Sequence, residues 1–392
     1  MKKTNLGILT LLVLPTSIAL AQTSTQSIPI TVDCGNGQSL NRTISRLEKH
    51  VPATVSVLGT CTEFVQIIGF DNLILKGGPG AILAQPSTGS GNLFNSVLLI
   101  ESSRHVTVSG FSIQADTTIV SAVGIGHGSS DIRLLNLNVK GGTEGITIFE
   151  NSQVLLAHVS GQDPGYTPLG IYDLSDVHVE HCLFENSTGA PWHVGIDLDA
   201  GHLTMFDTTI RNMQQGMNAR AGSIVDLSAY DTYTPFGGPS DVIIDSPAGT
   251  NFDGVALDGG SSLNVSTKLQ INQPGQFWGG TTAGVLVSNG STLNASNTNL
   301  VIAGSHGQGI VVMNNSHATL TGATVTGGGH GGLVLANLSS IDVSGAGLLT
   351  LVGGNGVDLF CDSGSTITGS ANFAGLPTSQ CANVLAAEAV LP

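Results

Sequence analysis

The chain has 392 residues, of which only 10% are charged and 53 are glycine. Twelve Lys and Arg side chains stand against 27 Asp and Glu, which gives a formal net charge of −15. This balance argues against nucleic acid or an anionic lipid surface as a partner, because both bind through basic patches. It also disfavours a strongly polyanionic substrate unless a local basic site overrides the overall field.

The first residues predict a signal peptide and not a part of the fold. Two lysines are followed by an apolar segment over 6–14 and by small residues over 19–21 at the cleavage positions, so residues 1–21 are expected to be removed. The apolar segment is too short for a membrane span, and no later stretch reaches about 18 uninterrupted apolar residues. We therefore expect a secreted protein, extracellular or periplasmic, without a membrane span.

Residues 22–60 are expected to form an N-terminal cap and the first coil of a repetitive fold. The segment 39–49 predicts an amphipathic helix, with Ser39 as N-cap and Leu40, Ile44 and Leu47 on its apolar face. It lies just before the repeats, where a stacked fold needs a lid over its open end.

The rest of the chain repeats a glycine followed by alternating apolar residues. Most steps between successive glycines are 21 to 25 residues long, and two steps are longer. The repeats begin at Gly124, Gly145, Gly170, Gly195, Gly216, Gly254, Gly284, Gly309, Gly332 and Gly356. Each repeat holds three short strand-like segments and a polar turn that usually contains serine. A leucine-rich repeat would need a fixed leucine pattern, and a β-propeller would need four strands in about 40 residues.

Three short strands per repeat bury their inner faces only when successive coils stack about 4.8 Å apart. The pattern predicts an all-β fold, a single-stranded right-handed parallel β-helix of about 12 coils over residues 61–370. Residues 371–392 lose the repeat and are expected to form a C-terminal cap or tail.

The five cysteines fit an oxidising compartment. Cys34 and Cys61 flank the start of the mature chain, Cys361 and Cys381 flank its end, and each pair is expected to form a disulfide. Cys182 lies in a strand-like segment and is expected to be a buried free thiol.

These glycine and serine repeats resemble the pectin-lyase-like right-handed parallel β-helix superfamily over nearly the whole mature chain. The resemblance implies the fold, but that superfamily includes polysaccharide lyases, glycoside hydrolases, uronate epimerases, adhesins and proteins with no known reaction. Polygalacturonases carry Asn-Thr-Asp, Asp-Asp and Arg-x-Lys motifs, and pectate lyases carry Arg-x-Pro-x-x-Arg. All of these are missing here, so no specific enzyme family is matched.

Aromatic residues indicate where a ligand could bind. All four Tyr and both Trp lie between residues 166 and 278, in or near unusually long loops. Sugar rings stack on exposed aromatic side chains, so a carbohydrate cleft is expected here. The alternative is that these side chains only pack loops over the helix. The expected substrate-binding residues are Tyr172, Trp192, Tyr230, Tyr233 and Trp278.

Charged residues occupy outward strand positions in the same coils. With Ile196 and Leu198 facing inward, Asp197 and Asp199 face outward on one strand, about 6.5 to 7 Å apart. That separation suits the acid and base of an inverting glycosidase. Asp199, Arg220 and Asp258 are expected to stack in a column, about 4.8 Å per coil.

Arg220 is expected to orient carboxylates or substrate, and His193, two residues before Gly195, is the histidine candidate for a general base. Catalysis, ligand or calcium binding, and a solvated salt-bridge column without function all remain open for this group. No loop is dense enough in oxygen ligands to name a calcium site.

The leading hypothesis is an exported β-helix protein that binds a polysaccharide or cell-surface glycan in a central cleft and acts on it as a hydrolase or a lyase. The alternative is a non-catalytic adhesin or structural β-helix protein. The missing motifs favour it, as do the apolar outward residues Leu286, Val311 and Val334 in late coils.

Overall fold

The computed structural model of the chain describes residues 28–87, 96–187, 193–227, 241–246, 252–272, 282–295, 299–304, 307–326, 331–343, 349–352, 359–369, 371–373 and 383–384. The predicted signal peptide lies outside these residues, and so do Trp192, Tyr230, Tyr233, Trp278 and Cys381.

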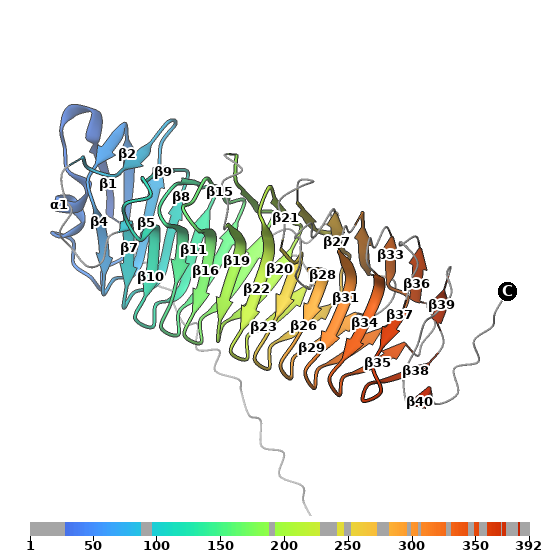
Figure 1. Cartoon of the computed structure of the whole chain (residues 1–392). Helices are drawn as coiled ribbons and strands as arrows, with labels where there is room; N and C mark the ends of the chain where they lie inside the picture. Colours follow the sequence, from blue (N-terminus) through green and yellow to red (C-terminus); the bar gives the residue numbers. More distant parts are fainter. Residues whose placement is uncertain are drawn as a thin grey trace, which may run out of the picture.

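Short strands stack coil upon coil into three sheets that run the length of an elongated molecule (Figure 1). Over the described residues the sheets hold 15, 12 and 13 strands, and they are called here sheets 1, 2 and 3. Each strand pairs in parallel with the equivalent strand of the next coil, as β1 does with β2, β10 with β13 and β12 with β15. The predicted fold class, an all-β parallel β-helix, is confirmed.

Sheet 1 comprises β1 (Ile28–Asp33), β2 (Ala53–Leu58), β5 (Asp71–Gly77), β8 (Arg104–Ser109), β11 (Ser130–Leu135), β14 (Gln153–Ala157), β17 (Asp176–Glu180), β20 (His202–Phe206), β23 (Ile224–Leu227), β26 (Ser262–Val265), β29 (Thr292–Ala295), β32 (His317–Leu320), β35 (Ser340–Val343), β38 (Thr366–Gly369) and β40 (Asn383–Val384). Sheet 2 comprises β4 (Val65–Ile68), β7 (Ser96–Glu101), β10 (Ser121–Gly126), β13 (Glu144–Ile148), β16 (Thr167–Tyr172), β19 (Val194–Asp199), β22 (Gln215–Arg220), β25 (Val255–Leu257), β28 (Ala283–Val287), β31 (Gln308–Met313), β34 (Gly331–Ala336) and β37 (Leu359–Cys361). Sheet 3 comprises β3 (Thr60–Thr62), β6 (Ile82–Ala84), β9 (Ser112–Gln114), β12 (Asn138–Lys140), β15 (Ser160–Gln162), β18 (Leu183–Glu185), β21 (Thr208–Arg211), β24 (Val242–Asp245), β27 (Leu269–Asn272), β30 (Leu300–Ala303), β33 (Thr324–Thr326), β36 (Leu349–Val352) and β39 (Ala371–Phe373).

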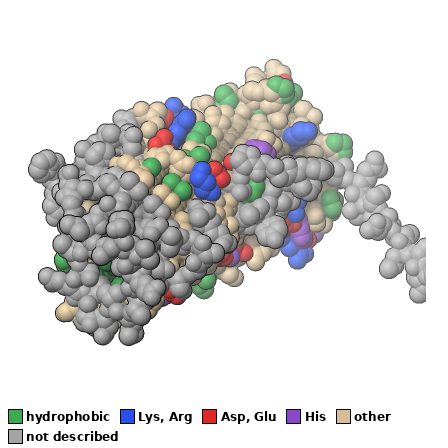
Figure 2. All heavy atoms as spheres, turned by 90° about the vertical axis from the view of Figure 1, so that its right-hand side faces the viewer, with side chains coloured by type: hydrophobic (Ala, Val, Ile, Leu, Met, Phe, Trp, Pro, Cys, Tyr) green, Lys and Arg blue, Asp and Glu red, His purple; other side chains and the backbone are tan. Residues whose placement is uncertain are grey.

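The inward side chains of the three sheets form one continuous apolar core, which runs from Val32 near the first coil to Ile367 near the last. Strand side chains alternate between the two faces of a sheet, so every second residue of a short strand points into the core. Charged side chains are few and scattered on the face that Figure 2 shows. Burial of this core is the main force that holds the coils in register.

The recurring glycine marks a bend at the start of the strands of sheet 2. A Cβ atom at Gly254 would lie 2.5 Å from Cγ2 of Ile271 and 2.6 Å from the carbonyl oxygen of Gly284. Gly284 is equally crowded, by Ile302 and by Gly309 of the next coil. A side chain cannot be accommodated at this position, and the sequence repeat is therefore a steric requirement.

Gly124 and Gly170, which the repeat groups with these glycines, occupy a different position. Each lies beside Thr147 in the register of sheet 2, and Gly170 pairs in turn with Asp197. They are outward-facing residues, and grouping them with the bend glycines was wrong by two residues.

A buried serine closes the turn from sheet 2 to sheet 1 in most coils. Ser223 Oγ donates to the carbonyl of Arg220 at 2.6 Å and accepts the N–H of Gly201 from the preceding coil at 3.2 Å. Ser261 repeats both contacts one coil later, with Asp258 and Ser223. This ladder satisfies backbone groups that would otherwise be buried without partners.

At the N-terminal end, the predicted helix is present but shorter than expected. α1 (Leu40–Ile44) begins after Ser39, whose side chain accepts the Arg42 N–H, and it buries Leu40 and Ile44 completely. Glu63 accepts the Leu40 N–H at 2.6 Å. The role of this segment as a cap stays a prediction.

The cysteines follow the predicted pattern as far as the described residues reach. Cys34 and Cys61 are joined, with 5.1 Å between their Cα atoms. Cys361 is disulfide-bonded, and its predicted partner lies outside the described residues. Cys182 is a buried free thiol, and burial raises its pKa to about 12. Within the described ranges, no helix is long and apolar enough to cross a lipid bilayer.

Candidate functional site

A groove of about 400 Å³ lies on the outer face of sheet 2. It is lined by side chains in or next to five successive strands, β7, β10, β13, β16 and β19. The lining side chains are Ser96, Leu99, Val120, Ser121, Glu144, Thr147, Phe149, Tyr172, Asp173 and Asp199. Tyr172 and Asp199 were predicted as site residues from the sequence, whereas Glu144 was not.

The predicted orientation of β19 is confirmed. Ile196 and Leu198 are fully buried in the core, and Asp197 and Asp199 project from the other face. In the register of sheet 2, Asp197 pairs with Asn218 and Asp199 pairs with Arg220. The outer face of the sheet thus brings together acidic and basic side chains from strands that are more than 20 residues apart.

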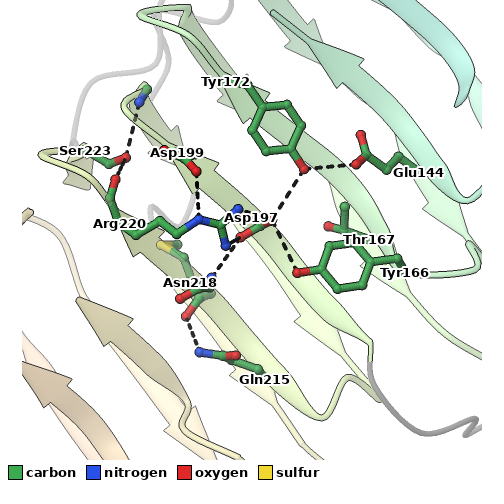
Figure 3. A network of polar contacts seen from close by, with 12 residues as sticks. Glu144, Tyr166, Thr167, Tyr172, Asp197, Asp199, Gln215, Asn218, Arg220 and Ser223 are labelled. Atoms are coloured by element: carbon green, nitrogen blue, oxygen red, sulfur yellow. Dashed lines mark hydrogen bonds and ion pairs between the residues drawn. The ribbon is translucent and has the colours of Figure 1, made fainter. Parts of the chain in front are cut away.

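Asp197 is the centre of a buried polar network (Figure 3). Only 1% of the residue is exposed. Its carboxylate accepts hydrogen bonds from four side chains: Asn218 Nδ2 at 2.9 Å, Arg220 at 3.0 and 3.3 Å, Tyr166 Oη at 3.3 Å and Tyr172 Oη at 3.3 Å. A carboxylate engaged on both oxygens holds its neighbours in place, and it has no face open to a substrate.

Glu144 lies on the other side of Tyr172, at the start of β13. Tyr172 Oη donates to its Oε1 at 3.0 Å, and Thr147 Oγ1 donates to its Oε2 at 2.7 Å. Burial raises the pKa of Glu144 above its usual range, and the negative charge of Asp197 adds to the rise. Its two hydrogen bonds and Arg220 oppose that rise without cancelling it. Glu144 is therefore a carboxyl group that keeps its proton to a higher pH than an exposed one.

The phenol of Tyr172 reaches Glu144 because Gly170, two residues earlier on the same strand, has no side chain to block it. A Cβ atom at Gly170 would lie 2.7 Å from Tyr172 Oη and 2.9 Å from Glu144 Oε2. Burial, followed by the charge of Glu144, raises the pKa of Tyr172, so the hydroxyl remains a proton donor. Glycine at an outward position thus shapes the floor of the groove.

Asp199 and Arg220 form an ion pair next to this network. Arg220 Nε donates to Asp199 Oδ2 at 2.9 Å, and 43% of the Asp199 side chain is exposed. Burial alone would lower the pKa of Arg220, but the hydrogen bond to Asp199 and the charge of Asp197 raise it instead. Arg220 is a cation shared by two carboxylates, and its orienting role stays a prediction.

The remaining predicted residues lie elsewhere. His193 is buried, with Nε2 donating to the Gly165 carbonyl at 3.1 Å and Nδ1 against the Asn186 amide, and burial lowers its pKa. None of its described contacts is to Asp197. Asp258 follows Leu257, which pairs with Ala219, but its carboxylate accepts from Ser288 at 2.8 Å and Asn289 at 2.5 Å. Catalytic roles for these two residues stay predictions.

One group of metal-binding side chains lies close enough together to share an ion within the described part of the chain. It consists of Cys34, Cys61 and Glu63. The two sulfur atoms are joined in a disulfide, so they are not free to bind a metal.

No protein-family model matches the sequence, and a search of curated proteins gave no match. Among solved structures, ORF18 of Geobacillus virus E2 is similar at 12% identity and a TM-score of 0.39, over 88% of this chain and 62% of that one. The mannuronan C-5 epimerase AlgE4 A-module of Azotobacter vinelandii is similar at 11% and 0.40, over 84% and 89%. The receptor-binding tailspike of bacteriophage Det7 is similar at 11% and 0.35, over 90% and 75%. This chain spans less than two thirds of the first of these chains, and similarity at this level assigns it no function.

Proposed function

We propose that the groove over sheet 2 binds and hydrolyses a polysaccharide, with Glu144 as the general acid and Asp199 as the base that activates water. The observation that carries this proposal is the raised pKa of Glu144 in a solvent-open groove that Asp199 also lines. Glycoside hydrolases usually act through two carboxyl groups whose environments differ.

The chemistry balances with these two groups and one water molecule. Glu144 gives its proton to the leaving glycosidic oxygen as the bond to the anomeric carbon breaks. Asp199 takes a proton from the water molecule that attacks the same carbon. The products are a new reducing end and a free hydroxyl group, and a proton returns from Asp199 to Glu144 through solvent.

Asp197 takes a positioning role in this proposal, in place of the acid or base role expected from the sequence. Its buried carboxylate holds Tyr172 and Arg220 and contributes to the raised pKa of Glu144. Arg220 in turn fixes Asp199 at the edge of the groove.

Hydrolysis fits the groove better than β-elimination. A lyase removes the proton next to a uronate carboxylate, and that step needs a cation to neutralise the developing charge. The described lining residues include no Lys, Arg or His. The adjacent Arg220 is already paired with two carboxylates.

Secretion is part of the proposal. The predicted signal peptide supports it, and the Cys34–Cys61 disulfide forms readily only in an oxidising compartment. A polysaccharide or a cell-surface glycan is then the accessible partner.

The mature protein, residues 22–392, should be assayed on a panel of polysaccharides for new reducing ends and for the ultraviolet absorbance of unsaturated uronides. Reducing ends without absorbance are the expected result. Both signals together would replace hydrolysis with elimination. Binding without either signal would favour the non-catalytic adhesin instead.

A further inference from the structure

We infer that the groove takes an uncharged polysaccharide, laid along the solenoid axis with one sugar ring on Phe149, and excludes polyuronates. This inference rests on the proposed function and names its class of substrate. It follows from the charges of the groove, from an apolar surface over its first three coils, and from the order of its lining residues along the coils.

The charges of the groove disfavour the binding of a uronate. Glu144, Asp173 and Asp199 line the groove, and Asp197 lies beneath it. Even with Glu144 protonated, three carboxylates face one cation, because Arg220 is the sole basic side chain that the described contacts join to this network. A uronate would lose hydration here without gaining a free cation, and the chain's net charge of −15 adds long-range repulsion.

An apolar surface extends over the first three coils of the groove, at β7, β10 and β13. It consists of Leu99, Val120 and Phe149, and 54% of Val120 is exposed. The Phe149 ring lies over Gly126, where a Cβ atom would clash with it, and it contacts His127 edge to face with 5.9 Å between ring centroids. Its position is therefore fixed by packing. A rigid aromatic face of this kind suits the C–H face of a neutral sugar ring.

Hydroxyl groups line the groove on the same three coils. Ser96 and Ser121 line the groove next to Thr147, and Ser121 Oγ is 2.6 Å from Thr147 Oγ1. Such groups exchange hydrogen bonds with sugar hydroxyls without adding charge. Since the lining residues follow one another from β7 to β19, a bound chain crosses successive coils, from Leu99 and Val120, past Phe149 and Glu144 at the two ends of β13, to Asp199.

The test measures binding separately from cleavage, with the full mature chain carrying Glu144→Gln. The probes are neutral glucans, galactans, mannans and xylans, together with polygalacturonate and alginate, each polyuronate being paired with its carboxyl-reduced form. The reduced form keeps the linkages and loses only the charge. Affinity electrophoresis or calorimetry at constant ionic strength gives the dissociation constants.

At least one neutral glycan should bind at least tenfold more tightly than any polyuronate. Phe149→Ala should weaken that binding about tenfold, whereas Phe360→Ala, which alters an exposed outward phenylalanine on β37 of the same sheet, should not. If Phe149→Ala does not fold, Val120→Asn at the exposed residue is the second variant and should also weaken binding. Asp173→Asn should reduce the difference between the dissociation constants of neutral glycans and of polyuronates.

The outcomes separate this inference from the proposed function. A polyuronate that binds as tightly as every neutral glycan, or binding that is indifferent to both Phe149→Ala and Val120→Asn, would overturn the inference and leave hydrolysis intact. Neutral glycans that bind but are not cleaved by the unaltered protein would support the inference and overturn the hydrolysis. Absence of binding to every probe would overturn both.

Discussion

Tyr172 Oη lies 3.0 Å from Oε1 of Glu144, across the boundary between two adjacent coils. The same oxygen lies 3.3 Å from Oδ2 of Asp197. A hydroxyl group has one proton, so Tyr172 cannot donate to both carboxyl groups at once. The contact to Glu144 is the shorter one, so Tyr172 donates mainly to Glu144. This hydrogen bond opposes, without cancelling, the rise that burial causes in the pKa of Glu144.

Tyr172→Phe should move the alkaline limb of the pH profile of kcat/KM to higher pH. The hydrogen bond from Tyr172 favours the ionised form of Glu144 and lowers its pKa, so loss of the hydroxyl should raise that pKa further. The general acid would then stay protonated to higher pH. Tyr166→Phe is the matched control, because Tyr166 contacts Asp197 and not Glu144 among the described contacts. A limb that stays in place, or moves down, in Tyr172→Phe would contradict the assignment of Glu144.

Gly170→Ala should reduce hydrolysis at least tenfold with little loss of stability. The added methyl group would lie 2.7 Å from Tyr172 Oη and must displace the phenol from Glu144. Gly364→Ala is the control, since its Cβ meets the flexible end of Leu338 at 3.1 Å. Initial rates and thermal unfolding measure the two effects. Full activity in Gly170→Ala would show that the position of Tyr172 does not matter.

Arg220→Met should lower the free energy of unfolding by about 3 kcal/mol, because it leaves the buried carboxylate of Asp197 without its cation. This is the low end of the range for a buried pair, since 38% of the Arg220 side chain is exposed. Arg211→Met breaks an ion pair with Glu185 on sheet 3, and it should cost at most about 1 kcal/mol. Urea unfolding measures the free energy of unfolding of both variants and of the unaltered protein. Equal losses in the two variants would be inconsistent with a buried, charged Asp197.

Asp253→Asn should remove a pH-dependent loss of stability. Burial raises the pKa of Asp253 to about 7, while its Oδ1 still accepts the Ala283 N–H at 2.7 Å. The folded state therefore holds this proton more tightly than the unfolded state. The contribution is complete below about pH 4 and is lost as pH rises through 7, by at most about 4 kcal/mol.

The measurement is the free energy of unfolding at pH 4 to 8 for both proteins. Between pH 4 and pH 8 the unaltered chain should lose stability relative to Asp253→Asn. Parallel curves would show that Asp253 titrates alike in the folded and unfolded states.

The fold could be predicted from the sequence because steric requirements determine which residues recur in each coil. Gly254 and Gly284 have no room for a Cβ atom, and residues such as Ile196 and Leu198 alternate strictly into the core. The same alternation correctly turned Asp197 and Asp199 outward. These features depend on a residue's own coil and its immediate neighbours, so they can be recognised without coordinates.

The site was only partly predictable, because it depends on register between coils. Gly170 was grouped with the bend glycines, although it is an outward residue that pairs with Asp197. Glu144 went unnoticed, although an acidic residue directly before a bend glycine is a signal that the sequence does contain. Its raised pKa comes from burial and from Asp197, more than 50 residues away. Periodicity alone gives no such information.

The most direct test of the central claim compares Glu144→Gln with Glu185→Gln, a matched change at a carboxylate that pairs with Arg211 on sheet 3. Both variants are assayed for release of reducing ends and for binding to the same glycan. Glu144→Gln should lose about 10²–10⁴-fold in kcat, the usual contribution of a general acid, and should bind the glycan within twofold of the unaltered protein. Glu185→Gln should match the unaltered protein in both. Hydrolysis by Glu144→Gln at the unaltered rate would contradict the role of Glu144 as the general acid.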